Sequence, residues 1–406
     1  MTKILIHDWA GHWFPIDLSR ELSRRGYDVT HAYFSGVQGP KGPLERRAGD
    51  PPNLRILERT LPTPFAKYDF VRRWFQERRY GRDMARLIRE ERPDIVLSTT
   101  TPLDIQSAIE SQTSKIGSAF IYWLQDMQSE AMSALLPQKY PGVGHLIANH
   151  YKSFERRVLT KADHVICICD EFAEHLRSWN IPSDRLSVIE NWASYGEIEP
   201  QDKDNSWSRA LGLADKRVFL YAGTLGLKHN PEILRRLAAI HSDDKSIAVV
   251  VASEGLGADW LKERKGAEGL DNLNLLPFQP IEAFPQMLAS ADVTIGIIEP
   301  DAAGYSVPSK VLSYLAAGRS ILLSVPSNNL IARLITDSGA GVVVAPGNTE
   351  AFLAEAHRLI SDRELRERCE ANARRCAAEK FDIRRIADTF EVIFRVVTAP
   401  GAEERP

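Results

Sequence analysis

The chain has 406 residues, of which 44% are hydrophobic and 26% are charged, and its formal net charge is −3. This composition is typical of a globular protein, and the near-neutral charge gives no indication of a general nucleic-acid-binding protein. A single hydrophobic core rarely serves a chain of this length, so two domains of about 200 residues each are expected.

In the first half of the chain, short apolar strands alternate with helices. Such alternation predicts a parallel sheet that is covered by helices on both faces. The predicted elements are strand 3–7, helix 17–25, strand 27–33, helix 70–92, strand 94–98, strand 117–124, helix 149–162, strand 164–169 and strand 186–190.

The second half repeats the pattern after a polar stretch, 197–209, which contains Pro200 and several charges and predicts a linker. The predicted fold class is α/β, with two doubly wound, Rossmann-like domains in tandem whose loops face a shared cleft. The elements of the second half are strand 218–221, helix 231–240, strand 247–252, strand 273–277, helix 281–291, strand 293–298, strand 321–325, helix 330–337 and strand 341–345.

Targeting segments and special cysteine sites are not expected. The chain enters a strand at Lys3 without a signal peptide, and no run approaches the roughly 20 apolar residues of a membrane span. The four cysteines lack the spacing of a zinc site and are expected to be reduced, as in a cytosolic protein. They are Cys167, Cys169, Cys369 and Cys376.

The most informative segment is Pro308-Ser309-Lys310, which opens a predicted helix after the strand 293–298. Proline suits the first turn of a helix, and Ser306 suits the N-cap position. The free N–H groups at such a terminus attract a phosphate, and Lys310 adds a full positive charge. An ordinary capped helix with a solvated lysine explains the same residues equally well.

A second loop of the same kind follows the strand 218–221. It contains Gly223, Gly226 and Lys228, and a helix then opens at Pro231. Glycines let the backbone approach a ligand closely, and a lysine neutralises a phosphate. A tight turn with a solvated lysine is the alternative, but two such loops in one half of the chain favour a diphosphate site.

Other ligand motifs are missing. The first strand is followed by a loop with Gly11 alone, where a dinucleotide-binding fold needs Gly-x-Gly-x-x-Gly, so a nicotinamide or flavin enzyme is disfavoured. The triplet Asp202-Lys203-Asp204 lies in the predicted linker and is interpreted as linker charge rather than as a metal motif. No metal site and no cofactor are therefore expected.

At this point the sequence resembles a known family. The stretch Tyr221-Ala222-Gly223-Thr224 to Lys228, followed by Pro308-Ser309-Lys310 to Arg319, resembles the family-4 glycosyltransferases of the GT-B fold. Val188-Ile189-Glu190-Asn191-Trp192 is similar to the element that closes their first domain. Leu124 to Met132 resembles a subgroup that builds exopolysaccharide and O-antigen chains, including colanic-acid-type transferases. The resemblance spans Lys3 to about Val397.

The resemblance implies a retaining, metal-independent transfer from a nucleotide-diphosphate sugar, with no cofactor beyond that donor. It implies an acceptor-side domain at 1–196, a linker at 197–209 and a donor domain at 210–380. A C-terminal helix at 381–398 would cross back to the first domain, and a tail would follow at 399–406. The implied protein is a cytoplasmic hexosyl- or N-acetylhexosaminyltransferase of surface polysaccharide biosynthesis.

The residue-by-residue match gives the donor side. Lys228 and Lys310 would hold the diphosphate and act in catalysis. Thr224 stands where many members carry arginine, and Ser313 where many carry the glutamate that binds ribose. A carboxylate from Glu299 or Asp301 is a guess for the missing acid. The other expected donor-binding residues are Gly223, Glu254, Phe278 and Ser309. Of these, Glu254 and Phe278 would flank the nucleobase. Alternatively, Phe278 is only a core residue.

The acceptor side is predicted from the loops of the first domain. Asp126 follows an apolar strand and would orient or deprotonate an acceptor hydroxyl, with a helix cap as the equal alternative. His7, Asp8, Gly11 and His12 line the first loop. For His7, a satisfied and partly buried histidine is the slightly favoured interpretation.

Segment 65–82 mixes aromatic residues with arginines and predicts a helix that lies at a lipid surface, which would suit a lipid-linked acceptor at the inner face of the cell membrane. A helix packed by its aromatic face explains it at least as well. Two rival functions use the same fold: a nucleotide-sugar 2-epimerase, and a non-catalytic partner that only binds a sugar nucleotide. The partners expected are a nucleotide sugar and a glycan, lipid-linked or small-molecule acceptor, and no nucleic acid.

Overall fold

A computed structural model of the protein describes residues 1–37, 41–66, 69–193, 198–226, 229–299 and 310–399. The chain folds into two compact units, and each is described by itself. The first unit comprises Met1–Asn191 together with the chain from Ile383 onward, and the second comprises Trp192–Asp382.

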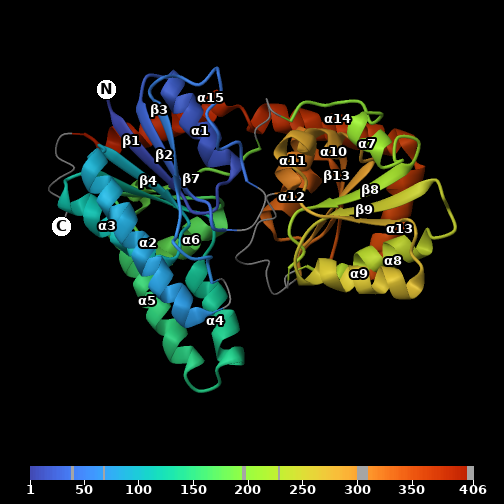
Figure 1. The fold of residues 1–406 in the computed structure, drawn as a ribbon, viewed down its shortest axis with the longest axis horizontal. Coiled ribbons are helices and arrows are strands. Elements are labelled where there is room, and N and C mark those ends of the chain that lie inside the picture. Colours follow the sequence, from blue (N-terminus) through green and yellow to red (C-terminus); the bar gives the residue numbers. More distant parts are fainter. Residues whose placement is uncertain (38–40, 67–68, 194–197, 227–228, 300–309, 400–406) are drawn as a thin grey trace. The chain divides into compact units, whose positions relative to one another are not determined.

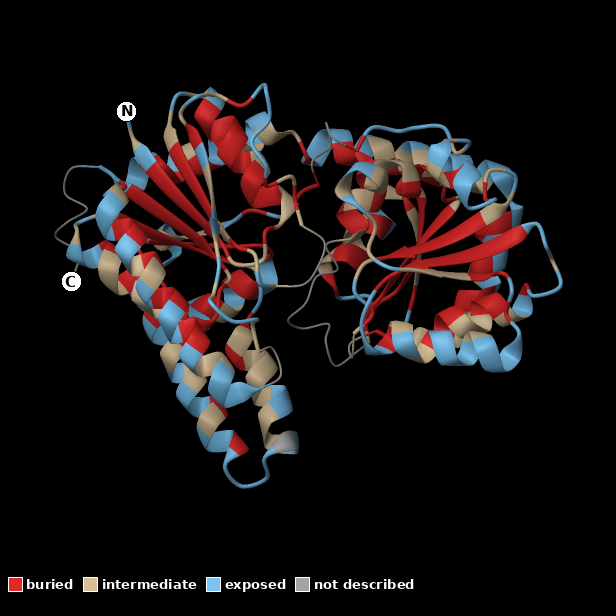
Figure 2. Ribbon diagram, viewed as in Figure 1, coloured by how far each residue is buried: buried red, intermediate tan, exposed pale blue. Residues whose placement is uncertain are grey.

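The first unit is built on a seven-stranded sheet with the order β3-β2-β1-β4-β5-β6-β7, in which every pairing is parallel. Three of its seven strands, β4, β5 and β6, are buried from end to end, and helices lie against both faces (Figures 1 and 2). The strands are β1 (Lys3–Asp8), β2 (Asp28–Phe34), β3 (Leu54–Arg59), β4 (Ile95–Thr99), β5 (Ala119–Leu124), β6 (His164–Cys167) and β7 (Leu186–Val188).

The helices of the first unit connect these strands. They are α1 (Trp13–Arg24), α2 (Phe70–Glu91), α3 (Leu103–Lys115), α4 (Gln128–Lys139), α5 (Gly144–Lys161), α6 (Asp170–Ser178) and the C-terminal α15 (Ile383–Val397), with a 3-10 turn at Ser183–Arg185. Helix α15 packs on α1, where the guanidinium of Arg25 reaches Asp388 at 2.6 Å and Glu391 at 2.8 Å. The last helix therefore belongs to the first unit.

The second unit has a six-stranded parallel sheet with the order β10-β9-β8-β11-β12-β13. Its strands are β8 (Arg217–Ala222), β9 (Ile247–Ala252), β10 (Leu273–Leu276), β11 (Val293–Ile297), β12 (Ser320–Ser324) and β13 (Gly341–Val344). Its helices are α7 (Ser206–Ala210), α8 (Pro231–Ile240), α9 (Leu256–Glu268), α10 (Phe284–Ala289), α11 (Lys310–Ala316), α12 (Leu330–Ser338), α13 (Thr349–Ser361) and α14 (Arg363–Lys380), with a 3-10 turn at Ile281–Ala283.

The predicted α/β fold with two parallel-sheet domains is confirmed. Both sheets reverse their strand order next to the first strand, between β1 and β4 and between β8 and β11. In open α/β sheets the loops at the carboxyl ends of the strands bind ligands at such a switch point. The candidate sites are therefore the loops that follow β1 and β4–β5 in the first unit, and β8, β9 and β11 in the second.

Several elements are absent from the sequence-based prediction. Helices α3, α4, α6, α9 and α13 and strand β3 were not identified, and α1 begins at Trp13 instead of residue 17. Strand β3 is an edge strand and carries Arg55, Glu58 and Arg59, so it lacks the continuous apolar run of a central strand. Helix α7 lies within the stretch that predicted a linker, and its N-cap Asn205 accepts hydrogen bonds from the backbone of Trp207 and Ser208.

None of the helices in the described part of the chain is long and apolar enough to cross a membrane. The four cysteines are buried, and none of them forms a disulfide bond in the described part of the chain.

Candidate active site

The second unit joins its two central strand ends through one buried side chain, Tyr314 of α11. Its hydroxyl accepts a hydrogen bond from the backbone N–H of Ala222 at 3.0 Å, and lies 3.2 Å from the carbonyl of Ala222 and 3.4 Å from that of Ile295. Ala222 ends β8 and Ile295 lies in β11. Tyr314 therefore fixes the first turns of α11 against the switch point of the sheet.

One turn before Tyr314, Lys310 reaches back over β8. Its Nζ atom lies 3.7 Å from the centroid of the Tyr221 ring, in a cation–π contact. Burial raises the pKa of Tyr221 well above its ordinary value, so the ring stays neutral beneath the lysine. The ammonium group is thus held at the carboxyl end of β8, where the loop of glycines begins.

Gly223 allows this close approach. Its φ is +122°, a conformation that side chains rarely adopt, and a Cβ atom there would lie 3.1 Å from Cε and 3.3 Å from Nζ of Lys310. The structure brings the two predicted donor residues Gly223 and Lys310 together. Any other residue at 223 would strain the backbone and displace the lysine.

The rest of this loop is held by its neighbours. The hydroxyl of Tyr221 donates to the carbonyl of Thr224 at 2.8 Å, and the backbone N–H of Gly226 donates to Nδ1 of His229 at 3.0 Å. Thr224 itself is exposed. The expected site residues Lys228 and Ser309, and the alternative acid Asp301, lie outside the described residues.

The loop after β9 is joined to the loop after β8. The backbone N–H of Leu225 donates to the carbonyl of Glu254 at 3.2 Å, and that of Gly257 donates to the carbonyl of Leu225 at 3.0 Å. Gly255 has φ +115°, and a Cβ atom there would lie 3.0 Å from the carbonyl oxygen of Leu225. Glu254 is exposed, and Phe278, beyond β10, is partly buried. The predicted donor residues therefore follow three neighbouring strands.

Two further candidate ligand-binding residues, Glu299 and Ser313, follow β11 in the chain. Glu299 is partly buried, and its Oε1 atom is inaccessible to solvent and has no hydrogen-bond partner among the described residues. Ser313 is partly buried on α11, one turn after Lys310. A carboxylate and a hydroxyl at these positions are able to bind the hydroxyl groups of a ligand.

In the first unit, Asp8 at the end of β1 organises the following loop. Its carboxylate is fully buried and accepts hydrogen bonds from the backbone of Ala10 at 3.1 Å and of His12 at 2.6 Å. Nδ1 of His12 lies 3.5 Å from the same carboxylate, and the His12 side chain is 45% exposed. Gly11, with φ +72°, forms the bend between them.

The charges of this loop favour a cationic His12. Burial acts against the charged form of Asp8, but the interaction with His12 and the backbone N–H of Ala10 outweigh it and lower the pKa of Asp8. For His12 burial likewise opposes the charge, but the carboxylates of Asp8 and then Asp126 raise its pKa. Asp8, His12 and Asp126 thus act on one another electrostatically in the first unit.

His7 is not available to a ligand. It is fully buried, its Nδ1 atom lies 3.1 Å from the hydroxyl of Ser98, and its Nε2 atom lies 3.2 Å from that of Tyr80. Burial lowers the pKa of His7 to about 4. Its position is that of the satisfied core histidine, and it braces the end of β1.

Asp126 follows β5 and is exposed, and its backbone N–H lies 3.3 Å from the hydroxyl of Thr100. The N-cap position of α4 is Met127, so Asp126 does not act as the helix cap that the sequence offered as an alternative.

No cluster of three or more His, Cys, Asp or Glu side chains suited to a metal ion occurs in the described residues. The triplet at 202–204 is used in ion pairs: Lys203 pairs with Asp292, and Asp204 pairs with Arg209 at 2.6 Å. Metal independence stays a prediction.

Two family models together match most of the chain. Residues 16–192 match the glycosyl transferase 4-like domain, and residues 203–376 match glycosyl transferases group 1. The chain belongs to the family-4 glycosyltransferases of the GT-B fold.

Relatives of this glycosyltransferase carry matching names. It is 25% identical over 278 residues to the "Putative colanic acid biosynthesis glycosyl transferase WcaI" of Escherichia coli, covering 67% of each chain. It is 25% identical over 248 residues to the alpha-D-kanosaminyltransferase of Streptomyces kanamyceticus, covering 60% of this chain and 63% of the relative. The matches thus span about two thirds of these relatives.

Solved structures share the fold. Sucrose-phosphate synthase from Thermosynechococcus elongatus superposes with a TM-score of 0.74 at 14% identity, covering 98% of this chain and 100% of that one. HepE of Anabaena in complex with UDP and glucose gives 0.70 at 14% identity, covering 97% and 99%.

Sequence reasoning did not identify the residues that support the candidate donor site of this glycosyltransferase. Tyr221 and Tyr314 are buried aromatic residues within or beside apolar runs, where they are expected to be core residues. Only the fold places one tyrosine ring under Lys310 and the hydroxyl of the other on the end of β8. The signal available in sequence was the spacing of Lys310 and Tyr314, one helical turn apart.

Proposed function

We propose that this glycosyltransferase moves a sugar from a nucleotide-diphosphate donor to an acceptor with retention of anomeric configuration and without a metal ion. The observation that carries the proposal is the position of Lys310, held over Tyr221 and against Gly223 at the end of β8. The complexes of HepE with UDP-glucose and of a trehalose-6-phosphate enzyme with UDP-2-fluoro glucose support a nucleotide-sugar donor.

The proposed chemistry needs a fixed cation at this place. Cleavage of the bond between the anomeric carbon and phosphate develops negative charge on the leaving diphosphate. A preorganised ammonium group stabilises that charge in the transition state, as a metal ion does in other transferases. Lys310 supplies the cation, Gly223 lets the diphosphate approach the backbone, and Lys228 is proposed as a second cation.

The acceptor is proposed to bind in the first unit, beside Asp8, His12 and Asp126. In this arrangement Asp126 orients the acceptor hydroxyl, and the exposed ring of His12 binds acceptor oxygens. The name of the colanic acid relative supports a role in surface polysaccharide biosynthesis, whereas the kanosaminyltransferase supports a small-molecule acceptor. We favour the polysaccharide role because the segment after β5 resembles that subgroup.

The deciding experiment screens a panel of nucleotide sugars by thermal shift and calorimetry, and then follows turnover by NMR. An axial donor linkage that remains axial in the product supports retention, and full activity in EDTA supports metal independence. Lys310→Ala should weaken donor binding at least tenfold, whereas Lys262→Ala, an exposed lysine on α9, should not. Conversion of the donor without acceptor would indicate an epimerase, and binding without any turnover would indicate a non-catalytic protein.

A further inference from the structure

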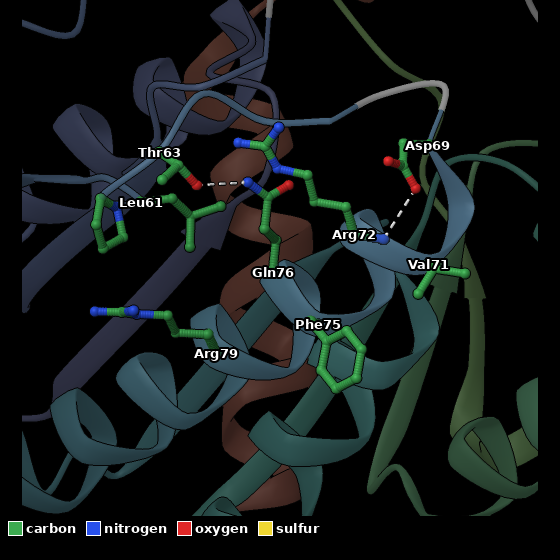
Figure 3. Close-up of a pocket in the computed structure, with 9 residues that line it drawn as sticks. Leu61, Thr63, Asp69, Val71, Arg72, Phe75, Gln76 and Arg79 are labelled. Atoms are coloured by element: carbon green, nitrogen blue, oxygen red, sulfur yellow. Dashed lines mark hydrogen bonds between the residues drawn. The ribbon is translucent and has the colours of Figure 1, made fainter.

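The first unit has a cavity of about 460 Å³ between the loop after β3 and the N-terminal half of α2 (Figure 3). We call it the α2 pocket. It combines charged, polar and apolar side chains, and the proposed chemistry uses none of them. The lining residues are Leu61, Pro62, Thr63, Asp69, Val71, Arg72, Phe75, Gln76 and Arg79.

Gln76 builds the wall of this pocket. Its side chain is 7% exposed and spans from the helix to the loop. Its Oε1 atom accepts a hydrogen bond from the backbone of Ala66 at 2.9 Å, and its Nε2 atom donates to the hydroxyl of Thr63 at 3.0 Å and to the carbonyl of Pro64 at 2.9 Å. Three hydrogen bonds from one buried amide hold the loop at a fixed place along α2, and they therefore define the shape of the pocket.

Two arginines of the pocket have no carboxylate partner among the described residues. Arg72 and Arg79 are exposed and lie two helical turns apart, on the side of α2 that faces Leu61 and Thr63 (Figure 3). Neighbouring cations of the same helix are used internally: Arg73 pairs with Glu77 at 2.5 Å, and Arg78 stacks on Trp74.

The one acid of the pocket is already engaged. Asp69 is the N-cap of α2 and accepts the backbone N–H of Arg72 at 3.1 Å. The two guanidinium groups are therefore left to bind an anion, for which their planar donors suit a phosphate.

Apolar side chains stand next to these arginines. Phe75, on the same stripe of α2 as Arg72 and Arg79, is 61% exposed, and Val71 is 64% exposed. Four of the nine other large apolar side chains that are exposed in the described part of the first unit lie on α4, on α5 or in the turn between them (Figure 1). They are Leu135, Tyr140, Val143 and Leu146.

We propose that the α2 pocket binds the phosphate group of an anionic membrane lipid, with Arg72 and Arg79 on the phosphate and Phe75 and Val71 on the hydrocarbon beside it. A helix that combines exposed aromatic and basic side chains binds at the lipid surface in this way. A soluble sugar phosphate would match the arginines but would leave the apolar side chains in water.

The pocket is also connected to the acceptor loop. Phe65, in the loop that Gln76 holds, packs edge-on against Trp9 at 5.5 Å between ring centroids, and Trp9 directly follows Asp8. If the proposed function holds, the bound lipid is the carrier of the acceptor sugar. Its phosphate then binds at α2, and the sugar extends toward Asp8 and His12. The binding of lipid phosphate itself does not rest on that function.

The test is sedimentation of the full chain with vesicles of phosphatidylcholine alone, with added phosphatidylglycerol, and with added polyprenyl phosphate. We expect binding to the vesicles that contain an anionic lipid, phosphatidylglycerol or polyprenyl phosphate, and a loss of at least tenfold in R72A/R79A. The matched control is R86A/R89A, which removes two exposed arginines from the same helix outside the pocket and should change binding less than twofold. Phe75→Ala should weaken binding, whereas Val392→Ala, which truncates an exposed apolar side chain of α15 outside the pocket, should not.

Preference for polyprenyl phosphate identifies the acceptor carrier, and equal binding of phosphatidylglycerol identifies a general lipid phosphate; both support the pocket. Three results would overturn the proposed lipid site. The first is an equal loss of binding in R72A/R79A and R86A/R89A, and the second is equally strong binding to vesicles of phosphatidylcholine alone. The third is full competition by inorganic phosphate together with no effect of Phe75→Ala. Donor binding measured in the same variants separates the two proposals. It should be unchanged in R72A/R79A, and Lys310→Ala should leave vesicle binding unchanged.

Discussion

The ammonium group of Lys310 lies 3.7 Å from the centre of the Tyr221 ring. This contact holds a positive charge at the end of β8, beside the loop of glycines. An aromatic face fixes the position of a lysine while the side chain keeps its charge, and we propose that this charge stabilises the diphosphate of the donor.

Removal of the cation should therefore act on the donor and not on the fold. Lys310→Ala should weaken nucleotide-sugar binding or slow turnover at least tenfold, which corresponds to about 1.4 kcal/mol. Calorimetry and steady-state kinetics measure both. Lys310→Arg should retain part of the effect, since the charge remains. Donor kinetics that match wild type in Lys310→Ala would contradict the assigned role.

Gly223→Ala should disturb the same site through the backbone. The φ of +122° and a Cβ contact of 3.1 Å to Lys310 predict a loss of roughly 1–3 kcal/mol in stability, together with weaker donor binding. Gly266→Ala is the control, because Gly266 lies inside α9 with no atom within 4 Å of a new Cβ atom. That change should be neutral or stabilise by about 0.5–1 kcal/mol. Thermal unfolding of both variants tests the contrast.

Two buried tyrosines offer a second contrast. Tyr314→Phe removes the partner of the Ala222 N–H and should destabilise the second unit by about 1–3 kcal/mol. The hydroxyl of Tyr122 in β5 is buried without a hydrogen-bond partner among the described residues, so Tyr122→Phe should be neutral or stabilising. Denaturant unfolding of the two variants measures the difference; equal losses would mean that the hydroxyl of Tyr314 does not hold β8 and α11 together.

The strands of the second unit could be predicted from the sequence because they are short apolar runs. Helix α8 and strand β9 have the predicted bounds. It was insufficient for α9, whose glycines and charges weaken the helical pattern, and for the charged edge strand β3. At the candidate site, the predicted meeting of Gly223 and Lys310 depends only on strand order. The support from Tyr221 and Tyr314 depends on packing across β8, β11 and α11, which no local pattern contains.

Three histidines in β1, in β2 and in the loop after β1 should make the stability of the first unit depend on pH in two opposite senses. His7 and His31 are buried, and burial lowers the pKa of each to about 4. For these groups the unfolded chain binds more protons between pH 6.5 and 4, so stability of the first unit should fall as the pH decreases through this window. The pKa of His12 is raised instead, so its contribution is present below pH 6.5 and is lost as the pH rises through the folded-state value.

NMR titration of the histidine side chains checks this assignment. His12 should titrate above pH 6.5, and His7 and His31 should remain neutral until near pH 4. Asp8→Asn should shift the pKa of His12 downward, because Asp8 supplies the main favourable interaction with its charged form. Titration of His12 at an unchanged pH in Asp8→Asn would contradict the proposed coupling.

The last prediction concerns Glu299, which we propose as a donor-binding acid. Glu299 has a buried carboxylate oxygen without a hydrogen-bond partner among the described residues, at the end of β11. We expect it to accept hydrogen bonds from the donor, which would be worth about 1.5–3 kcal/mol for a charged acceptor. Glu299→Gln should therefore weaken nucleotide binding about tenfold, whereas Glu263→Gln on exposed α9 should have no effect.

Ser313→Glu decides whether Ser313 shares that role. In the wild-type background a second carboxylate would crowd Glu299, so donor binding should weaken. In the Glu299→Gln background the same change should restore binding, because Ser313 lies on the helix that begins at Lys310, one turn beyond the lysine. Calorimetry of the four proteins with one nucleotide sugar measures the interaction between the two positions. Additive effects would show that Glu299 and Ser313 contact different parts of the donor, and rescue would show that a single carboxylate is needed at one shared point.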